Sequence, residues 1–339
     1  MALLIEYVSE RAIGDVKEEE ARCMDVVNIA FGHVENGRVV WNHPECKEGL
    51  RRLRSIHPGM KILLSVGGWS AGGFSEIAFT KEGRQQFAKD SLALVEEYEL
   101  DGIDIDWEYP GIAAAGIGAD KADKENFTLL LKTLREVFED RQAGRYMLTI
   151  AAGGDSYYVR NTQMDEAVKY LDYVQIMTYD LRGGFQTLTG HHTSLYANQF
   201  DLFDACTDKA VKVYMEAGVP AEKLVIGGAF YSRKWEQVPD VDHGLCQMAQ
   251  TVGGYGKEYG ELVESYINKN GFVRYWDEEA KAPWLFDGST FISYDDEQSL
   301  GCKIEYLKEK GLAGIMCWEY IGDTTHTLTT FMRKELDRA

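Results

Sequence analysis

The chain has 339 residues, of which 45% are hydrophobic, and its 36 basic and 55 acidic residues give a formal net charge of −19 at pH 7. Nucleic acids and anionic membrane surfaces bind clustered Lys and Arg, so the negative net charge argues against both as partners. The sequence contains no apolar run of 18 or more residues, so it predicts no membrane-spanning helix. The length allows either two domains or one barrel-type domain with an insertion.

The amino-terminal residues 1–10, MALLIEYVSE, lack the basic region, apolar run and cleavage site of a secretory signal. The six cysteines fall at wide, irregular spacings without a Cys-x-x-Cys pair, which favours reduced and mostly buried thiols over a zinc site or a disulfide framework. Both observations lead us to expect a cytoplasmic protein. A secreted chain whose signal had been removed would have the same appearance.

Eight short apolar runs alternate with segments of helical periodicity, the pattern expected of βα units repeated around a parallel sheet. Most are rich in Val, Ile, Leu and aromatic residues, as strands covered on both faces are. The predicted strands are 3–8, 26–32, 61–67, 102–108, 147–152, 173–179, 224–231 and 313–319. The candidate helices between them include 83–99, 124–140 and 297–311, where apolar residues recur three and four positions apart. The sequence therefore predicts an α/β fold of the (β/α)8 TIM-barrel class.

One segment does not fit this alternation. The stretch between the seventh strand and the helix that begins near Glu297 is far longer than the ~2–6 residue loops typical of α/β units, and it is rich in Tyr, Trp and Gly. We expect residues 232–296 to form a small α+β insertion domain on the rim of the barrel. Residues 1–231 and 297–339 would then form the barrel itself.

The fourth predicted strand, in the stretch DGIDIDWEYP at 101–110, carries three carboxylates. Because side chains alternate across a strand, Asp104, Asp106 and Glu108 should face the inside of the barrel. Residues two apart are separated by roughly 6.6 Å along a strand, which places Glu108 at the carboxyl-terminal mouth, where barrel active sites lie. Closely spaced acids in a desolvated pocket cannot all ionise, so at least one should keep its proton, the condition for a general acid.

Structural roles for these acids have less support. An ion-pair role would need Arg or Lys at neighbouring inward positions, and the other seven strands offer only Lys61, at a strand start. A calcium or magnesium site would need further converging oxygen ligands, which the strand ends do not supply. His191 and His192 likewise lack converging partners for a metal site, so we expect them to structure a loop. We predict no metal and no other cofactor.

The stretch at 101–110 resembles the D-x-x-D-x-D-x-E signature of glycoside hydrolase family 18, the chitinase family. Further motifs follow in the family's order and at the expected strand ends: SVGGW at 65–69, MTYD at 177–180, FYSR at 230–233, and Trp318 at the end of the eighth strand. RYWDEEAKAPWLF and the following FISYDD resemble the end of the insertion domain found in the bacterial chitinase subgroup. The resemblance spans nearly the whole chain.

This resemblance implies a glycoside hydrolase that cleaves β-1,4-linked N-acetylglucosamine in chitin or chitooligosaccharides, with retention and by substrate-assisted catalysis. Glu108 would be the acid and later the base. Asp106 would orient the acetamido group of the substrate and balance the charge of an oxazolinium intermediate. Asp104 would share a proton with Asp106, and Tyr179 would donate a hydrogen bond to the acetamido carbonyl oxygen.

The resemblance also implies a set of substrate-binding residues. Trp318 would form the floor under the sugar at the cleavage site, and Trp69 would contact a sugar further along the cleft. Tyr7 and Ser65 would hydrogen-bond the inner carboxylate, Asp104. The remaining implied contacts are Tyr109, Met177, Asp180, Tyr231 and Arg233.

Two alternatives to a chitinase remain. An endo-β-N-acetylglucosaminidase acting on N-glycans would use the same acids, whereas a chitin-binding, lectin-like protein would typically lack the acid, and Glu108 is present. The insertion favours a chitinase, because such a wall deepens the cleft for a linear chain. We expect a monomer, with Trp41 and Trp107 in the core. It stays open whether the enzyme is endo- or exo-acting and whether Trp235, Trp276 and Trp284 reach the substrate.

Overall fold

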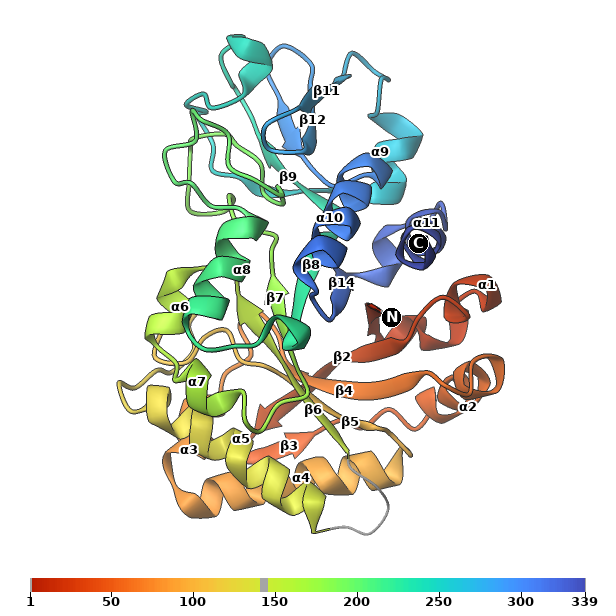
Figure 1. Cartoon of the computed structure of the whole chain (residues 1–339), viewed down its shortest axis with the longest axis vertical. Coiled ribbons are helices and arrows are strands. Elements are labelled where there is room, and N and C mark those ends of the chain that lie inside the picture. Colours follow the sequence, from red (N-terminus) through yellow and green to blue (C-terminus); the bar gives the residue numbers. More distant parts are fainter. Residues whose placement is uncertain (1, 141–145, 339) are drawn as a thin grey trace.

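Figure 1 shows the computed structural model of the chain, in which parallel strands form a barrel and a smaller sheet stands beyond one end of it. The structure describes residues 2–140 and 146–338. Within these residues, the larger sheet has the strand order β1-β14-β8-β7-β6-β5-β4-β2-β3, and a further pairing between β1 and β2 closes it. No helix in this part of the chain has the length and hydropathy needed to cross a membrane.

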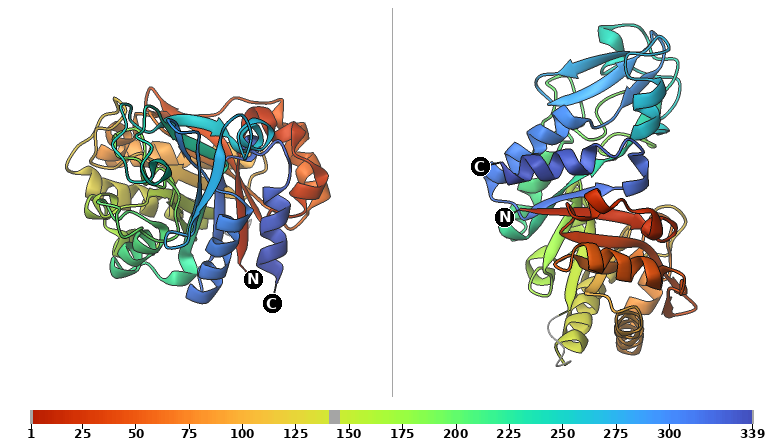
Figure 2. Two further views of the ribbon diagram at one scale, coloured as in Figure 1. Left: turned by 90° about the horizontal axis from the view of Figure 1, so that it is seen from above. Right: turned by 90° about the vertical axis from the view of Figure 1, so that its right-hand side faces the viewer.

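Eight parallel strands form the closed barrel and confirm the predicted (β/α)8 fold. They are β1 (Leu3–Ser9), β2 (Val26–Glu35), β4 (Lys61–Gly67), β5 (Gly102–Asp106), β6 (Met147–Gly153), β7 (Tyr173–Met177), β8 (Leu224–Ala229) and β14 (Gly314–Trp318). Each begins within one residue of its predicted start. The short β3 (Arg38–Val40) pairs antiparallel with the end of β2. Because β1 pairs with β14, the two ends of the chain lie close together in both views of Figure 2.

Helices surround the barrel. The longer ones are α2 (Cys46–Ile56), α4 (Lys81–Glu97), α5 (Asp123–Glu139), α8 (Thr207–Glu216), α10 (Glu297–Lys310) and α11 (Leu328–Asp337). Shorter ones are α1 (Glu18–Ala21), α3 (Phe74–Phe79), α6 (Ser156–Arg160) and α7 (Met164–Ala167), with 3-10 turns at Glu10–Asp15, Ala221–Lys223 and Tyr320–Gly322. The helix α9 (Tyr259–Ser265) and a 3-10 turn at Asp242–Gly244 belong instead to the segment that forms the second sheet. Both ends of α10 follow from its sequence: the Asp296 carboxylate caps the first turn, and Gly311, with φ of 65°, ends the helix.

Two apolar layers hold the barrel together. The outer layer lies between strands and helices and contains Ile103, Ile105 and Trp107, each at most 1% exposed. The Trp107 ring stacks on Phe74 of α3 at 5.4 Å between centroids and meets Phe127 of α5 edge-on. The inner layer fills the barrel and includes Ile5, Tyr7, Leu63, Val225 and Met316. Since Ile103 and Ile105 face the helices, the acids that alternate with them on β5 face the interior.

The second sheet has five antiparallel strands in the order β10-β9-β13-β12-β11. They are β9 (Tyr231–Trp235), β10 (Gly254–Glu258), β11 (Val273–Asp277), β12 (Ala282–Phe286) and β13 (Phe291–Ser293). Figure 1 shows this sheet at the end of the barrel where β8 runs into β9. The sheet begins one residue before the predicted insertion, 232–296, and otherwise falls inside it; the domain boundaries stay a prediction.

The tryptophans and cysteines have mostly structural positions. Trp235 and Trp284 are buried in the core of the second sheet, so they line no cleft. Trp276 is partly exposed, and its indole N–H donates to Glu278. Trp41 and Trp107 are buried in the outer layer of the barrel, as predicted. All six cysteines are free thiols that are buried or half-buried.

Candidate active site

The predicted site residues meet at the carboxyl-terminal ends of the barrel strands. Asp104 and Asp106 lie on β5, and Glu108 lies in the turn beyond it. The prediction that the strand continues to Glu108 is wrong: β5 ends at Asp106, opposite Gly67, where β4 also ends, so residues 107 and 108 have no partner on that side. From the other strands come Tyr7, Ser65, Met177, Tyr231 and Trp318.

Asp104 is the innermost acid, and it is fully buried. Its Oδ2 accepts hydrogen bonds from Tyr7 Oη at 2.8 Å and Ser65 Oγ at 2.7 Å. Its Oδ1 accepts from Thr149 Oγ1 at 2.7 Å and Gln175 Nε2 at 2.9 Å. Burial raises the pKa of Asp104, while these four hydrogen bonds stabilise its ionised form and oppose the rise. The carboxyl group of Asp104 is therefore fixed in position by its four hydrogen bonds.

Asp106 is in the opposite situation. It is 4% exposed, and no hydrogen-bond donor in the described part of the chain reaches its Oδ1. Burial, followed by the charges of Glu108 and Asp104, raises the pKa of Asp106 well above its usual range. Because the oxygens of Asp104 already accept four hydrogen bonds, a proton shared by these two acids belongs on Asp106. Protonation there relieves the repulsion among the three carboxylates.

Glu108 lies at the mouth and is 9% exposed. Burial raises its pKa to about 7; a hydrogen bond with Tyr109 opposes the shift and the charge of Asp180 adds to it. The Tyr109 ring lies 6.5 Å from the ring of Trp69, which is 47% exposed at the entrance. Near neutral pH, both the protonated and the ionised form of a carboxyl group with this pKa are present, so the group can first give and then accept a proton.

Asp180 is held as a permanent anion beside these acids. Its Oδ1 accepts from Tyr231 Oη at 2.7 Å and from Arg233 Nε at 2.6 Å, and its Oδ2 accepts from Arg233 Nη2 at 2.5 Å. Burial acts to raise the pKa of Asp180, but hydrogen bonds and charge from His192 and Arg233 hold it well below the usual range. Tyr255 packs on the guanidinium of Arg233 at 3.9 Å. The result is a rigid polar clamp on one side of the mouth.

Aromatic side chains form the floor of the mouth. Trp318 meets Tyr7 edge-on at 5.7 Å between ring centroids and stacks with Phe31 at 5.3 Å. Tyr179 is 8% exposed, and its hydroxyl lies 3.6 Å from the sulfur of Met316. The site therefore combines a flat apolar surface with acids of different protonation states, which suits a ligand whose rings carry C–H faces and polar edges.

Several residues of the site lie outside the sequence predictions. Thr149 and Gln175 bind Asp104, and Asn28 Nδ2 donates to Gln175 Oε1 at 2.9 Å. Each of the three is a polar residue at an inward position of an otherwise apolar strand, so the alternation of side chains along the strand could have predicted that it faces the barrel interior. Phe31 and Tyr255 had no such signal, because their contacts depend on how separate elements pack.

His191 Nε2 lies 3.1 Å from Asp277 Oδ2, so this loop histidine is engaged with the second sheet. In residues 2–140 and 146–338, the one group of His, Cys, Asp and Glu atoms close enough to hold an ion is formed by His43, Glu45 and Cys46. None of these belongs to the predicted site.

Comparisons with known proteins identify several relatives of this chain. The model of the family described as glycosyl hydrolases family 18 matches residues 4–323. Chitinase A1 of Niallia circulans is 37% identical over 85% of this chain, and chitotriosidase-1 of Mus musculus is 32% identical over 87%. The chain spans only 44% and 66% of the lengths of these two proteins. A solved structure of a glycoside hydrolase family 18 N-acetylglucosaminidase from Paenibacillus barengoltzii is 53% identical and superimposes with a TM-score of 0.98, covering 99% of this chain and 100% of that one.

Proposed function

Because this chain belongs to glycosyl hydrolase family 18, we propose that it hydrolyses the β-1,4 linkages of N-acetylglucosamine oligomers, in chitin or in soluble chitooligosaccharides. The observation that carries this function is the inward series of acids on β5, which ends in a buried Glu108 whose pKa is raised to about 7. Relatives named as chitinases support the class of substrate. The series differs from a lectin-like site, which has no need of a proton donor at the mouth.

In the proposed mechanism, the substrate supplies its own nucleophile. The carbonyl oxygen of the N-acetyl group attacks the anomeric carbon, while Glu108 gives its proton to the glycosidic oxygen of the departing sugar. The oxazolinium ion that forms is then opened by water, and the ionised Glu108 takes a proton from that water. Two displacements at the same carbon leave its configuration unchanged.

Asp106 would control the acetamido group during these steps. It would pass the shared proton to Asp104 as it turns toward the substrate, accept a hydrogen bond from the acetamido N–H as a carboxylate, and balance the positive charge of the oxazolinium. Tyr179 would donate to the carbonyl oxygen. The contrast between the two inner acids supports this division: Asp104 is fixed by four hydrogen bonds, whereas Asp106 Oδ1 has no donor among the described residues. Asp106 is therefore the acid that is free to turn toward the substrate.

The floor and the clamp would position the sugar. A pyranose ring packs its C–H groups on an aromatic face, so Trp318 would lie beneath the sugar at the cleavage site. Trp69, exposed at the entrance, would contact a neighbouring sugar. Asp180 and Arg233 retain polar atoms for hydroxyl groups, since the Asp180 side chain is still 35% exposed within the clamp.

A product profile tests the function. We expect the purified chain to release N-acetylglucosamine or its dimer from chitotetraose and chitohexaose, and to leave a high-mannose N-glycan intact. The similarity to an N-acetylglucosaminidase makes the monomer one of these two expected products, and chromatography of the earliest products distinguishes monomer release from dimer release. Hydrolysis of the N-glycan with inert chitin oligomers would contradict the proposal, and so would tight binding of oligomers without any cleavage.

The pH dependence of activity should report on Glu108. Its proton must be present when the glycosidic bond breaks, so kcat/KM should fall about tenfold per pH unit above a pKa of about 7. The measurement is kcat/KM on a soluble chromogenic chitobioside between pH 5 and 9, with thermal unfolding recorded at each pH to show that the protein stays folded. A profile that is flat from pH 6 to 9 would contradict the assignment of Glu108 as the acid.

A further inference from the structure

A buried ion pair lies between the barrel and the second sheet. Lys303 of α10 and Asp295, which follows β13, are both fully buried, and Lys303 Nζ lies 2.6 Å from Asp295 Oδ2. Lys303 Nζ also donates to Thr193 Oγ1 at 2.6 Å and approaches the carbonyl oxygen of Gly227 at 3.3 Å. The three N–H groups of the ammonium therefore have three acceptors, which come from three separate parts of the chain.

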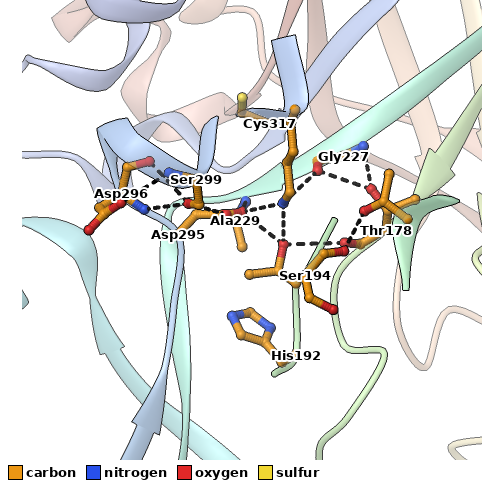
Figure 3. Close-up of polar contacts among 12 residues, drawn as sticks. Thr178, His192, Ser194, Gly227, Ala229, Asp295, Asp296, Ser299 and Cys317 are labelled. Atoms are coloured by element: carbon orange, nitrogen blue, oxygen red, sulfur yellow. Dashed lines mark hydrogen bonds and ion pairs between the residues drawn. The ribbon is translucent and has the colours of Figure 1, made fainter. Parts of the chain in front are cut away.

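Asp295 is equally well connected. Besides Lys303, its carboxylate accepts from Thr193 Oγ1 at 2.8 Å, from the backbone N–H of Ala229 at 3.1 Å and from Ser299 Oγ at 2.6 Å. Figure 3 shows Asp295, Ala229, Gly227 and Thr178 around this network, with the ring of His192 beside it. A network in which every buried group has a partner restricts its members to one arrangement.

The groups that this pair holds are next to substrate-binding residues in the sequence. Ala229 precedes Tyr231 by two positions, at the junction of β8 and β9. Thr193 Oγ1 lies 3.2 Å from the carbonyl oxygen of Thr178, which immediately precedes Tyr179. Thr178 Oγ1 in turn accepts from the N–H of Gly227 at 2.7 Å. The pair thus fixes the ends of two strands from which the mouth is built.

The pair also fixes the loop that supports the clamp. His192, adjacent to Thr193, is fully buried, and its Nδ1 lies 3.4 Å from the backbone nitrogen of Asp180 and 3.6 Å from Asp180 Oδ1. Its ring meets Tyr231 edge-on at 5.2 Å, and its own backbone N–H donates to Ser293 Oγ at 2.8 Å. A displacement of this loop would therefore displace the carboxylate of Asp180.

Stability alone does not account for such a pair. Replacing a buried ion pair with neutral groups of similar volume is often neutral or stabilising, because the attraction barely offsets the desolvation of two charges. We propose that Lys303 and Asp295 are positioning residues, which hold the ends of β7 and β8 and the loop of His192 so that Asp180 and Tyr231 stay in place for the substrate. Both residues are fully buried, so neither would contact the sugar, and this role rests on the proposed function.

The test replaces both charges together. In the double variant Lys303→Met, Asp295→Asn no charge is left unpaired, and the amide keeps an acceptor for Ala229. We expect an unchanged melting temperature, a fall of at least tenfold in kcat/KM on chitotetraose, and faster hydrogen exchange in residues 178–195. The matched control is Arg135→Met, Asp172→Asn, which removes a largely buried pair at the opposite, amino-terminal ends of β6 and β7. It should keep its kcat/KM.

Coupling to Asp180 separates positioning from a general loss of structure. If the pair acts through the clamp, removing it should lower kcat/KM by a much smaller factor in an Asp180→Ala background than in the parent. The reason is that both changes would disrupt the clamp around Asp180. Thr193→Val leaves both charges in place, and it should lower kcat/KM and speed hydrogen exchange by smaller factors than the double variant does. This single variant replaces the double variant in the test if the double variant does not fold.

Three results would overturn the role of the pair: kcat/KM within twofold of the parent, a loss that is fully additive with Asp180→Ala, or unchanged hydrogen exchange in residues 178–195. A parent chain that hydrolyses no chitin oligomer would instead refute the proposed function. Hydrogen exchange would still decide the question of the pair in that case, because it needs no turnover.

Discussion

Glu108→Gln should lower the turnover of chitin oligomers by about 10²–10⁴-fold, the usual contribution of a general acid, while leaving their affinity nearly unchanged. The amide has almost the same shape as the protonated acid, but it cannot release a proton to the glycosidic oxygen or accept one from water. Glu108 is 9% exposed, so acids of the solvent and buffer have little access to replace it as the proton donor. The measurement combines single-turnover kinetics with titration calorimetry on chitotetraose.

The control for this variant is Glu216→Gln, which changes an exposed glutamate at the end of α8 and should leave both quantities unchanged. A Glu108→Gln protein that hydrolyses chitotetraose at the parental rate would remove Glu108 from its role as acid. A variant that loses affinity and rate together would indicate that Glu108 mainly binds the substrate.

Asp106→Asn should reduce kcat by roughly 10²–10³-fold, the effect typical of removing one preorganised group that stabilises developing charge. The amide can still accept from the acetamido N–H, but it carries no negative charge to balance the oxazolinium. The loss should therefore appear in kcat more than in KM. Asp101→Asn is the matched control, since Asp101 stands just before the same strand, pairs with Arg54 and Lys61, and lies far from the mouth.

The substrate gives an independent test of the same mechanism. Fully deacetylated oligomers have no carbonyl oxygen to attack the anomeric carbon, so the parent enzyme should not cleave them. Efficient hydrolysis of glucosamine oligomers would rule out substrate assistance. It would leave the assignment of Glu108 intact, because an acid is needed in either mechanism.

The barrel was predictable because its strands are short apolar runs with clear beginnings. The ends of the strands were less predictable, as β5 shows: Trp107 and Glu108 continue the alternation of apolar and acidic residues, but β4 ends at Gly67 and leaves them without a partner. Strand order in the second sheet was not predictable either. There β9 lies between β10 and β13, and this pairing depends on packing around Trp235 and Phe291, not on any local period.

The site shows a similar division. The motifs predicted which residues approach the mouth, but the protonation states of the acids depend on contacts that no spacing contains. Asp104 and Asp106 are two positions apart and chemically identical, yet one accepts four hydrogen bonds and Oδ1 of the other accepts none from the described residues. The Lys303–Asp295 pair was equally hidden, because its main partner Thr193 is 110 positions from Lys303.

The pairing of β1 with β14 has a consequence for synthesis of the protein. Leu3 is a register partner of Gly314, so the seam of the barrel joins the beginning of the described chain to its last strand. During translation, β1 must keep an unpaired edge until residues 314–318 leave the ribosome, and an open edge can pair with other chains. Long-range closure of this kind also slows folding, because the loop entropy is lost before the contacts form. We therefore expect nascent chains of this protein to depend on chaperones until β14 has emerged.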